Sequence, residues 1–150
     1  MLSIRLLGPV SVLLDEHPLP LKRRKSRALL YYLAAQPQPV TRRQVAALLW
    51  SDHTDETARH NLRTTLYSLR QELGDHLRTE EEWISLEDVE VDPRTVAAAL
   101  AHPENDGIEA ALALYRGDFL ADFDLPDSEE YENWITVERD VPKVVHERSA

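Results

Sequence analysis

One stretch of the sequence, residues 55–73, combines an apolar stripe with side chains that could read double-stranded DNA. Its apolar residues recur at helical spacings and fall within an arc of about 80° on one side of a helix. These are Ala58, Leu62, Leu66, Leu69 and Leu73. The opposite side presents His60, Asn61, Arg63, Thr64 and Tyr67. Arginine can pair with guanine, asparagine with adenine, and threonine can touch the thymine methyl, so these five are the predicted base-reading residues.

The same predicted helix is strongly cationic. Arg59, Arg63 and Arg70 lie on or beside its polar face, and Glu72 is the one acidic residue between Thr57 and Leu73. A helix face that merely contacts water usually mixes acidic and basic residues. The bias seen here favours contact with a polyanion.

Basic residues also open the two preceding predicted helices, at residues 22–27 and 42–43. Cations at a helix N-terminus are unfavourable for the helix dipole, whereas a bound phosphate is favoured there. A polyanion would offset this cost by releasing its counterions. The predicted phosphate contacts are therefore Lys22, Arg23, Arg24, Lys25, Arg27, Arg42, Arg43, Arg59, Arg70 and Arg78.

The net charge of −10 hides two halves of opposite character. Residues 1–78 hold 12 basic and 7 acidic side chains, a net charge of +5, whereas residues 79–150 hold 5 and 20, a net charge of −15. The acidic total therefore does not argue against a nucleic-acid partner. It indicates a basic DNA-reading half and an acidic half that DNA should repel.

Several classes of protein are excluded by composition. The 150 residues include no cysteine, which removes disulfides, thiol catalysis and cysteine-containing zinc sites. The N-terminus lacks the pattern of a signal peptide, and no apolar stretch approaches the ~20 residues that span a bilayer. We predict a cytoplasmic protein with no membrane partner.

The elements that must position the DNA-reading residues follow a recognisable order. Strands are predicted at 3–7 and 10–14, helices at 22–35, 42–50 and 55–73, and a hairpin from strands at 77–79 and 83–86. Two helices joined by a short turn and framed by strands are the layout of a winged helix-turn-helix. This unit should end near residue 88.

The remainder of the chain is predicted to be all-α. Residues 89–93 read as a boundary, followed by helical segments at 94–101, 107–116 and 129–149. The predicted fold class is an α+β winged helix-turn-helix, with a small N-terminal antiparallel sheet, three helices and a C-terminal hairpin, followed by a helical segment. The corresponding domains are 1–88 and 91–150.

No residue pattern points to catalysis, a cofactor or a metal. Asp118, Asp122, Asp124 and Asp127 lack the mid-loop glycine and terminal glutamate of a calcium loop. His53 and His60 are seven apart rather than at the spacing of a helical zinc pair, and no glycine-rich phosphate loop occurs. We expect a protein that is not an enzyme and binds neither cofactor nor metal.

Several segments resemble the SARP class of bacterial transcriptional activators. They are 4–8 (IRLLG), 22–30 (KRRKSRALL), 40–50 (VTRRQVAALLW) and 58–75 (ARHNLRTTLYSLRQELGD), with 91–96 and 111–120 similar to the start of the second domain of that class. The resemblance implies an OmpR/PhoB-type winged helix followed by a bacterial transcriptional activation domain, a helical array similar to tetratricopeptide repeats. It covers nearly the whole chain, and 58–75 is its most specific part.

The resemblance also implies partners. Proteins of this class read direct-repeat promoter DNA, usually as two protomers side by side, and the helical domain contacts the second protomer or the transcription machinery, RNA polymerase included. By position, His60, Asn61, Arg63, Thr64 and Tyr67 inherit the major-groove role.

Two features depart from that class. The family's hairpin usually carries glycine or basic residues at its tip, whereas Glu80, Glu81 and Glu82 stand there. Three carboxylates should keep the tip away from phosphate, which leaves Arg78 and Thr79 as the hairpin's backbone contacts. The helical domain is also shorter than is usual, so we expect this chain to be part of a larger regulator or a short member of the class.

The residues leave a second function open. A winged helix can also serve as a protein-interaction module, with the acidic half as its interaction surface. Salt dependence separates the two, because removal of a phosphate-binding arginine flattens the salt dependence of DNA affinity by about one unit of slope.

Overall fold

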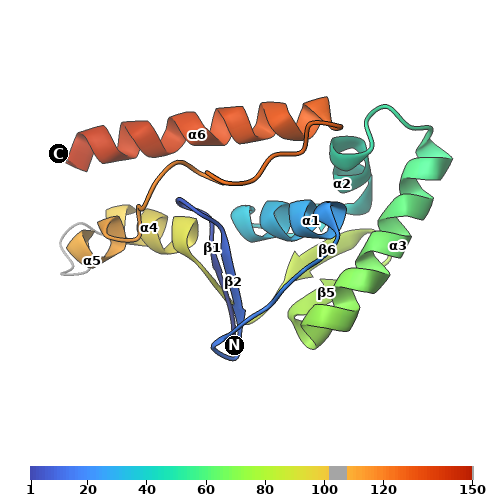
Figure 1. Ribbon diagram of the computed structural model, residues 1–150, viewed down its shortest axis with the longest axis horizontal. Helices are drawn as coiled ribbons and strands as arrows, with labels where there is room; N and C mark the ends of the chain where they lie inside the picture. The colour runs from blue at the N-terminus through green and yellow to red at the C-terminus, as the bar shows by residue number, and fades with distance from the viewer. Residues whose placement is uncertain (102–107, 150) are drawn as a thin grey trace.

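The computed structural model describes residues 1–101 and 108–149 (Figure 1). Its helices are α1 Arg24–Ala35, α2 Arg42–Leu49, α3 Asp55–Leu73, α4 Asp92–Ala101, α5 Ile108–Leu112 and α6 Glu129–Ser149, with a 3-10 turn at Gly74–His76. Its strands are β1 Leu2–Arg5, β2 Ser11–Leu14, β3 His17–Pro18, β4 Val40–Thr41, β5 Leu77–Thr79, β6 Trp83–Leu86 and β7 Val89–Val91. The helix predicted at 55–73 and the hairpin predicted at 77–86 are confirmed.

The strands form two small sheets. The first has the order β3-β2-β1-β7, and the second has the order β4-β6-β5. The antiparallel pairing of β1 with β2 confirms the predicted N-terminal sheet. In the second sheet β4 pairs with β6, which fixes the hairpin against the start of α2. α1 lies between the two sheets and α3 lies along the outer side of the second (Figure 1).

The segment predicted as a boundary, 89–93, is built into the first sheet instead. β7 pairs in parallel with β1, with Leu2 opposite Val89. The carboxylate of Asp92, only 5% exposed, accepts hydrogen bonds from the backbone N–H groups of Leu6 (2.7 Å) and Leu7 (2.9 Å). Burial raises the pKa of Asp92, and the two N–H donors oppose that rise. A solvent-exposed linker at this place is therefore wrong.

The two N–H donors make Asp92→Asn a destabilising change. An amide keeps one acceptor oxygen but turns an NH₂ group toward a buried N–H, so we expect a loss of about 1–3 kcal/mol in the free energy of unfolding. Urea unfolding measures it. Asp75→Asn, at an exposed position, should stay within about 0.5 kcal/mol of the parent. Equal stability of the two variants would contradict this role of Asp92.

The chain beyond α5 returns to the first sheet. The N–H groups of Arg116 and Leu120 donate to the carbonyls of Leu7 (3.1 Å) and Leu6 (2.8 Å). Gly8 has φ +115°, and an added Cβ there would lie 3.0 Å from the backbone of Arg116. Glycine is therefore required at this crossing, both for its backbone conformation and for the close approach.

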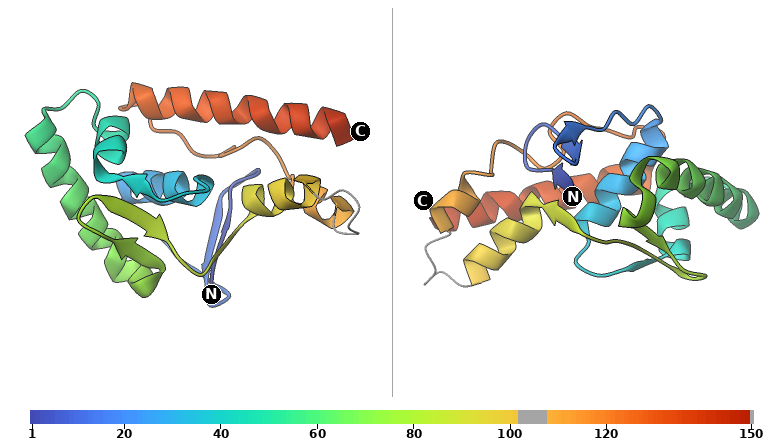
Figure 2. Two further views of the ribbon diagram at one scale, coloured as in Figure 1. Left: turned by 180° about the vertical axis from the view of Figure 1, so that it is seen from behind. Right: turned by 90° about the horizontal axis from the view of Figure 1, so that it is seen from below.

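α6 packs over α1 and α2 (Figure 2). The hydroxyl of Tyr131 donates to the carbonyl of Ala28 in α1 (2.6 Å), and the hydroxyl of Ser128 donates to that of Leu48 in α2 (2.6 Å). Trp134 stacks edge-on against Tyr32 and Phe119. Buried residues of both halves thus belong to one continuous core.

The second half is less helical than the sequence suggests. The helix predicted at 107–116 is confirmed over α5, after which residues 113–128 form turns and irregular chain; residue 107 lies outside the described residues. α4 contacts α5, whereas α6 lies on the other side of the first sheet, against α1 and α2. A repeat-like stacking of these helices stays a prediction.

Candidate nucleic-acid interface

α3 owes its position to its apolar stripe and its caps. Thr54 caps the N-terminus, its hydroxyl oxygen accepting the N–H of Thr57 (3.2 Å), and Gly74 ends the helix with φ +59°. The stripe is buried against α1 and α2. Its members are Ala58, Leu62, Leu66, Leu69 and Leu73, together with Thr65. The sequence therefore fixes which face of α3 turns outward.

The outward face carries the predicted base-reading residues. His60, Arg63, Thr64 and Tyr67 are exposed and Asn61 is half-buried. Tyr67 is 70% exposed, an unusual position for a large ring in the middle of a helix face. The hydroxyl of Thr64 donates to the carbonyl of His60 within the helix (3.1 Å), which leaves its oxygen lone pairs and methyl group outward. The structure brings these five together.

The arginines of α3 differ in their contacts. Arg59 and Arg63 are exposed, and neither makes an ion pair with any residue in the described part of the chain. Arg70 donates to the hydroxyl of Thr79 in β5 (3.1 Å), which places the hairpin beside the C-terminal half of α3. Two unpaired cations on one outward face leave positive charge available to a polyanion.

The basic residues at the start of α1 do not form one surface. Lys22, Arg23 and Arg24 are exposed. Lys25 instead turns inward: its ammonium donates to the carbonyl of Leu49 at the end of α2 (2.7 Å) and lies 5.5 Å from the centre of the Trp50 ring. Lys25 thereby holds the start of α1 against the turn between α2 and α3.

An acidic loop lies against this basic run, a contact that sequence reasoning missed. Asp124 lies 3.8 Å from Arg24, and Asp127 lies 3.5 Å from Lys25. The guanidinium of Arg27 stacks over the ring of Phe123 (5.6 Å). The oppositely charged runs at 22–27 and 118–127 are the signal in the sequence that could have found it. Exposed ion pairs of this kind contribute about 0–1 kcal/mol each, so phosphate can compete for the exposed cations.

The arginines that open α2 meet the hairpin tip. Arg43 is exposed, whereas the Nε of Arg42 donates to the backbone carbonyl of Glu80 (3.0 Å). The N–H of Arg42 also donates to the carbonyl of Glu82 (2.9 Å). The first turn of α2 and the acidic tip therefore form one continuous surface.

Arg78, the predicted phosphate contact of the hairpin, is engaged by carboxylates. Its guanidinium lies 3.0 Å from the carboxylate of Glu80 and 2.9 Å from that of Glu87. Hydrogen bonds from these two groups raise its pKa further above its ordinary value. A phosphate at this place would have to displace one of them.

Other kinds of site find no support among residues 1–101 and 108–149. No group of three or more acidic or histidine side chains in these residues could hold a metal ion. No helix of the described chain is long and apolar enough to cross a membrane.

Comparisons with known proteins give one informative likeness. No protein-family model and no curated protein matches the sequence. Among solved structures, the chain is similar to EmbR of Mycobacterium tuberculosis in complex with a low-affinity phosphopeptide, with a TM-score of 0.73 and 26% sequence identity. The match covers 97% of this chain and 43% of that chain, so this chain spans less than half the length of its neighbour. This likeness supports a SARP-like, mixed α/β fold.

Proposed function

We propose that this protein is a sequence-specific double-stranded DNA-binding regulator of transcription that reads the major groove with α3. The observation that carries the proposal is the outward face of α3, where His60, Arg63, Thr64 and Tyr67 stand exposed beside the half-buried Asn61. A major groove about 12 Å wide accepts one such helix. The structural likeness to EmbR supports a regulator of the SARP type.

The phosphate contacts belong first to the exposed cations. Lys22 and Arg23 at α1, Arg43 at α2, and Arg59 on α3 are exposed and have no ion pair within the described residues. Arg24 joins them once a phosphate replaces Asp124. Such contacts hold the reading helix in register without carrying sequence information.

The resemblance to the SARP class sets the finer part of the proposal. It makes the protein a cytoplasmic activator, bound to direct repeats beside a second protomer, whose tetratricopeptide-like helical half contacts RNA polymerase. α6 lies away from α3, on the other side of α1 (Figure 2), so protein contacts through α6 leave the DNA-reading face free. The phosphopeptide of the EmbR complex adds a protein ligand as a second candidate partner, which keeps the protein-interaction module as the alternative function.

A selection of bound sequences from random duplex DNA tests the proposal. We expect a recurrent motif in the selected pool and affinity for it that falls steeply with salt. A matched selection with the protein carrying Arg59→Ala, Arg63→Ala and Tyr67→Ala together should return no motif. A pool without enrichment and without salt-sensitive binding would favour the protein-interaction module.

Removal of charge at the hairpin tip should strengthen DNA binding. Glu81→Gln with Glu82→Gln removes two exposed carboxylates beside Arg42, and reduced repulsion of phosphate should raise affinity about two- to tenfold at low salt. Fluorescence anisotropy with labelled duplex measures the change. The matched pair Glu90→Gln and Glu109→Gln, exposed on β7 and α5, should have a smaller effect. Weaker binding of the tip variant would show that the tip faces something other than phosphate.

A further inference from the structure

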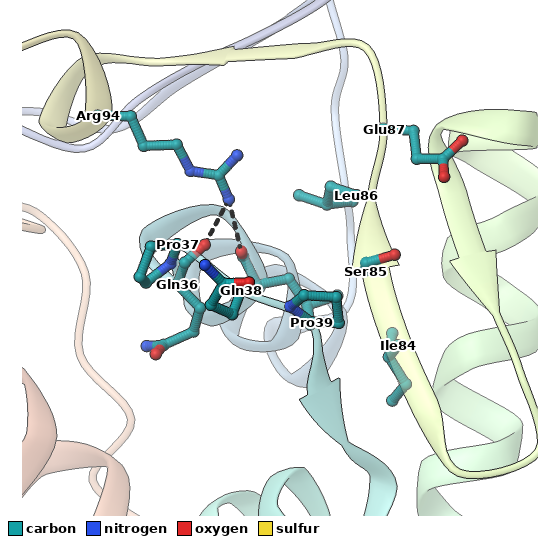
Figure 3. Close-up of a pocket in the computed structure, with 10 residues that line it drawn as sticks. Gln36, Pro37, Gln38, Pro39, Ile84, Ser85, Leu86, Glu87 and Arg94 are labelled. Carbon is teal, nitrogen blue, oxygen red and sulfur yellow. Dashed lines mark hydrogen bonds between the residues drawn. The ribbon is translucent and has the colours of Figure 1, made fainter. Parts of the chain in front are cut away.

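A pocket of about 230 Å³ opens where three parts of the chain meet, the loop after α1, the strand β6 and the start of α4 (Figure 3). None of the predicted DNA contacts lines it. Its walls are mostly apolar, and they are Leu33, Pro37, Pro39, Ile84 and Leu86, with Gln36, Gln38, Ser85, Glu87 and Arg94 as the polar members.

Arg94 is the cation of this pocket, and its hydrogen bonds are incomplete. One terminal nitrogen donates to the carbonyls of Leu33 (3.2 Å) and Gln36 (2.6 Å) at the end of α1. Figure 3 shows the other terminal nitrogen pointing away from these two carbonyls. The Nε is buried and has no hydrogen-bond partner in the described chain. An arginine offers five N–H groups, so several remain for a ligand.

No carboxylate neutralises this guanidinium. Among the lining residues Glu87 is the one acid, and its carboxylate turns away from the pocket to pair with Arg78 (2.9 Å). Burial lowers the pKa of Arg94, which reflects the cost of holding a cation out of water. The two carbonyls at the α1 C-terminus offset part of that cost. An anion in the pocket would offset the rest.

The rest of the lining sets the class of ligand. A single guanidinium matches a monoanion, and a carboxylate fits its planar fork with two hydrogen bonds. Inorganic phosphate or sulfate would need more donors than the apolar walls supply. Leu33, Ile84 and Leu86 instead favour an apolar body attached to the anionic group.

We propose that this pocket binds a small monocarboxylate, with the carboxylate on Arg94 and the apolar body against Ile84 and Leu86. The volume suits a body about the size of one aromatic ring. A ligand of that size has few atoms with which to bind, so a dissociation constant of about 1 mM is expected. This site is independent of the proposed DNA contacts.

Benzoate and its neutral counterpart benzamide are the probes that test the site. The Nε–Hε signal of Arg94 in proton–nitrogen correlation spectra should shift saturably with benzoate, and benzamide should bind about tenfold or more weakly. Arg94→Gln should remove benzoate binding. The matched control Arg78→Gln, on the neighbouring strand, should leave it within about twofold, a change of less than 0.5 kcal/mol.

Two further variants and ligands keep the outcome clear. Ser85→Trp fills the pocket without touching Arg94, so it should also abolish binding if Arg94→Gln fails to fold, as judged by thermal unfolding. Acetate, which lacks an apolar body, should bind more weakly than benzoate. Equal binding of benzoate and benzamide would show an apolar cavity rather than an anion site, and inorganic phosphate binding better than benzoate would overturn the ligand class.

Discussion

Replacement of Tyr131 by alanine is expected to lower the free energy of unfolding by about 3–5 kcal/mol, the range found when large buried aromatic side chains are truncated. Tyr131 is fully buried in α6 and contacts the rings of Phe123 and Trp134. Its hydroxyl donates to Ala28 in α1, and burial raises its pKa well above the ordinary value, so it stays protonated as a donor. Truncation therefore opens a cavity between the two halves of the chain.

The size of this effect is checked by urea unfolding followed by both circular dichroism and tryptophan fluorescence. Tyr67→Ala is the matched control, since it removes the same side chain from an exposed site and should cost less than about 0.5 kcal/mol. Tyr131→Phe keeps the ring and removes the hydroxyl, for an expected loss of about 0.5–1.5 kcal/mol. If the buried and exposed alanine variants were equally stable, α6 would not pack on α1 in solution.

Arg63→Ala is expected to weaken binding to the selected DNA site by about 1–3 kcal/mol, or roughly 5- to 150-fold, and to relax the preference at one base pair. Arg63 lies in the middle of the outward face of α3 and forms no ion pair within the described residues. Its guanidinium is therefore free to pair with two acceptors of a guanine. Because the side chain is exposed, the unfolding midpoint should not change.

Anisotropy titrations on the selected site and on each single-base variant of it measure this effect. Arg5→Ala removes an exposed arginine from β1, away from α3, and should leave the affinity within about twofold. A loss that is equal on every sequence, together with a salt slope flatter by about one, would make Arg63 a phosphate contact. Unchanged affinity would remove α3 from the proposed role.

The strongest periodic signals in the sequence predicted their elements well. The leucine stripe of 55–73 predicts α3 to the residue, because a regular spacing over five turns has no competing interpretation. Leu77–Thr79 and Trp83–Leu86 are likewise found as predicted around the acidic tip. These are local patterns, and local patterns are what one sequence displays.

Contacts between distant segments could not be predicted in the same way. Val89–Val91 is too short and too close to Pro93 to read as a strand, and it is one because β1 offers an open edge. Lys25 and Arg27 belong to a run of cations, yet their helical positions turn them toward Trp50 and Phe123. In each case the partner lies far along the chain, and the pattern of either segment alone is silent about it.

The parallel pairing of β1 with β7 has a consequence for how the protein folds. Strand β1 is synthesised first, but its outer edge stays open until Val89–Val91 and the Asp92 carboxylate arrive from the other half. Such non-local contacts slow folding, and an open strand edge promotes aggregation. A chain cut after residue 88 would keep every predicted DNA contact and lose the strand that closes the sheet. The DNA-reading unit and the acidic half are therefore one folding unit.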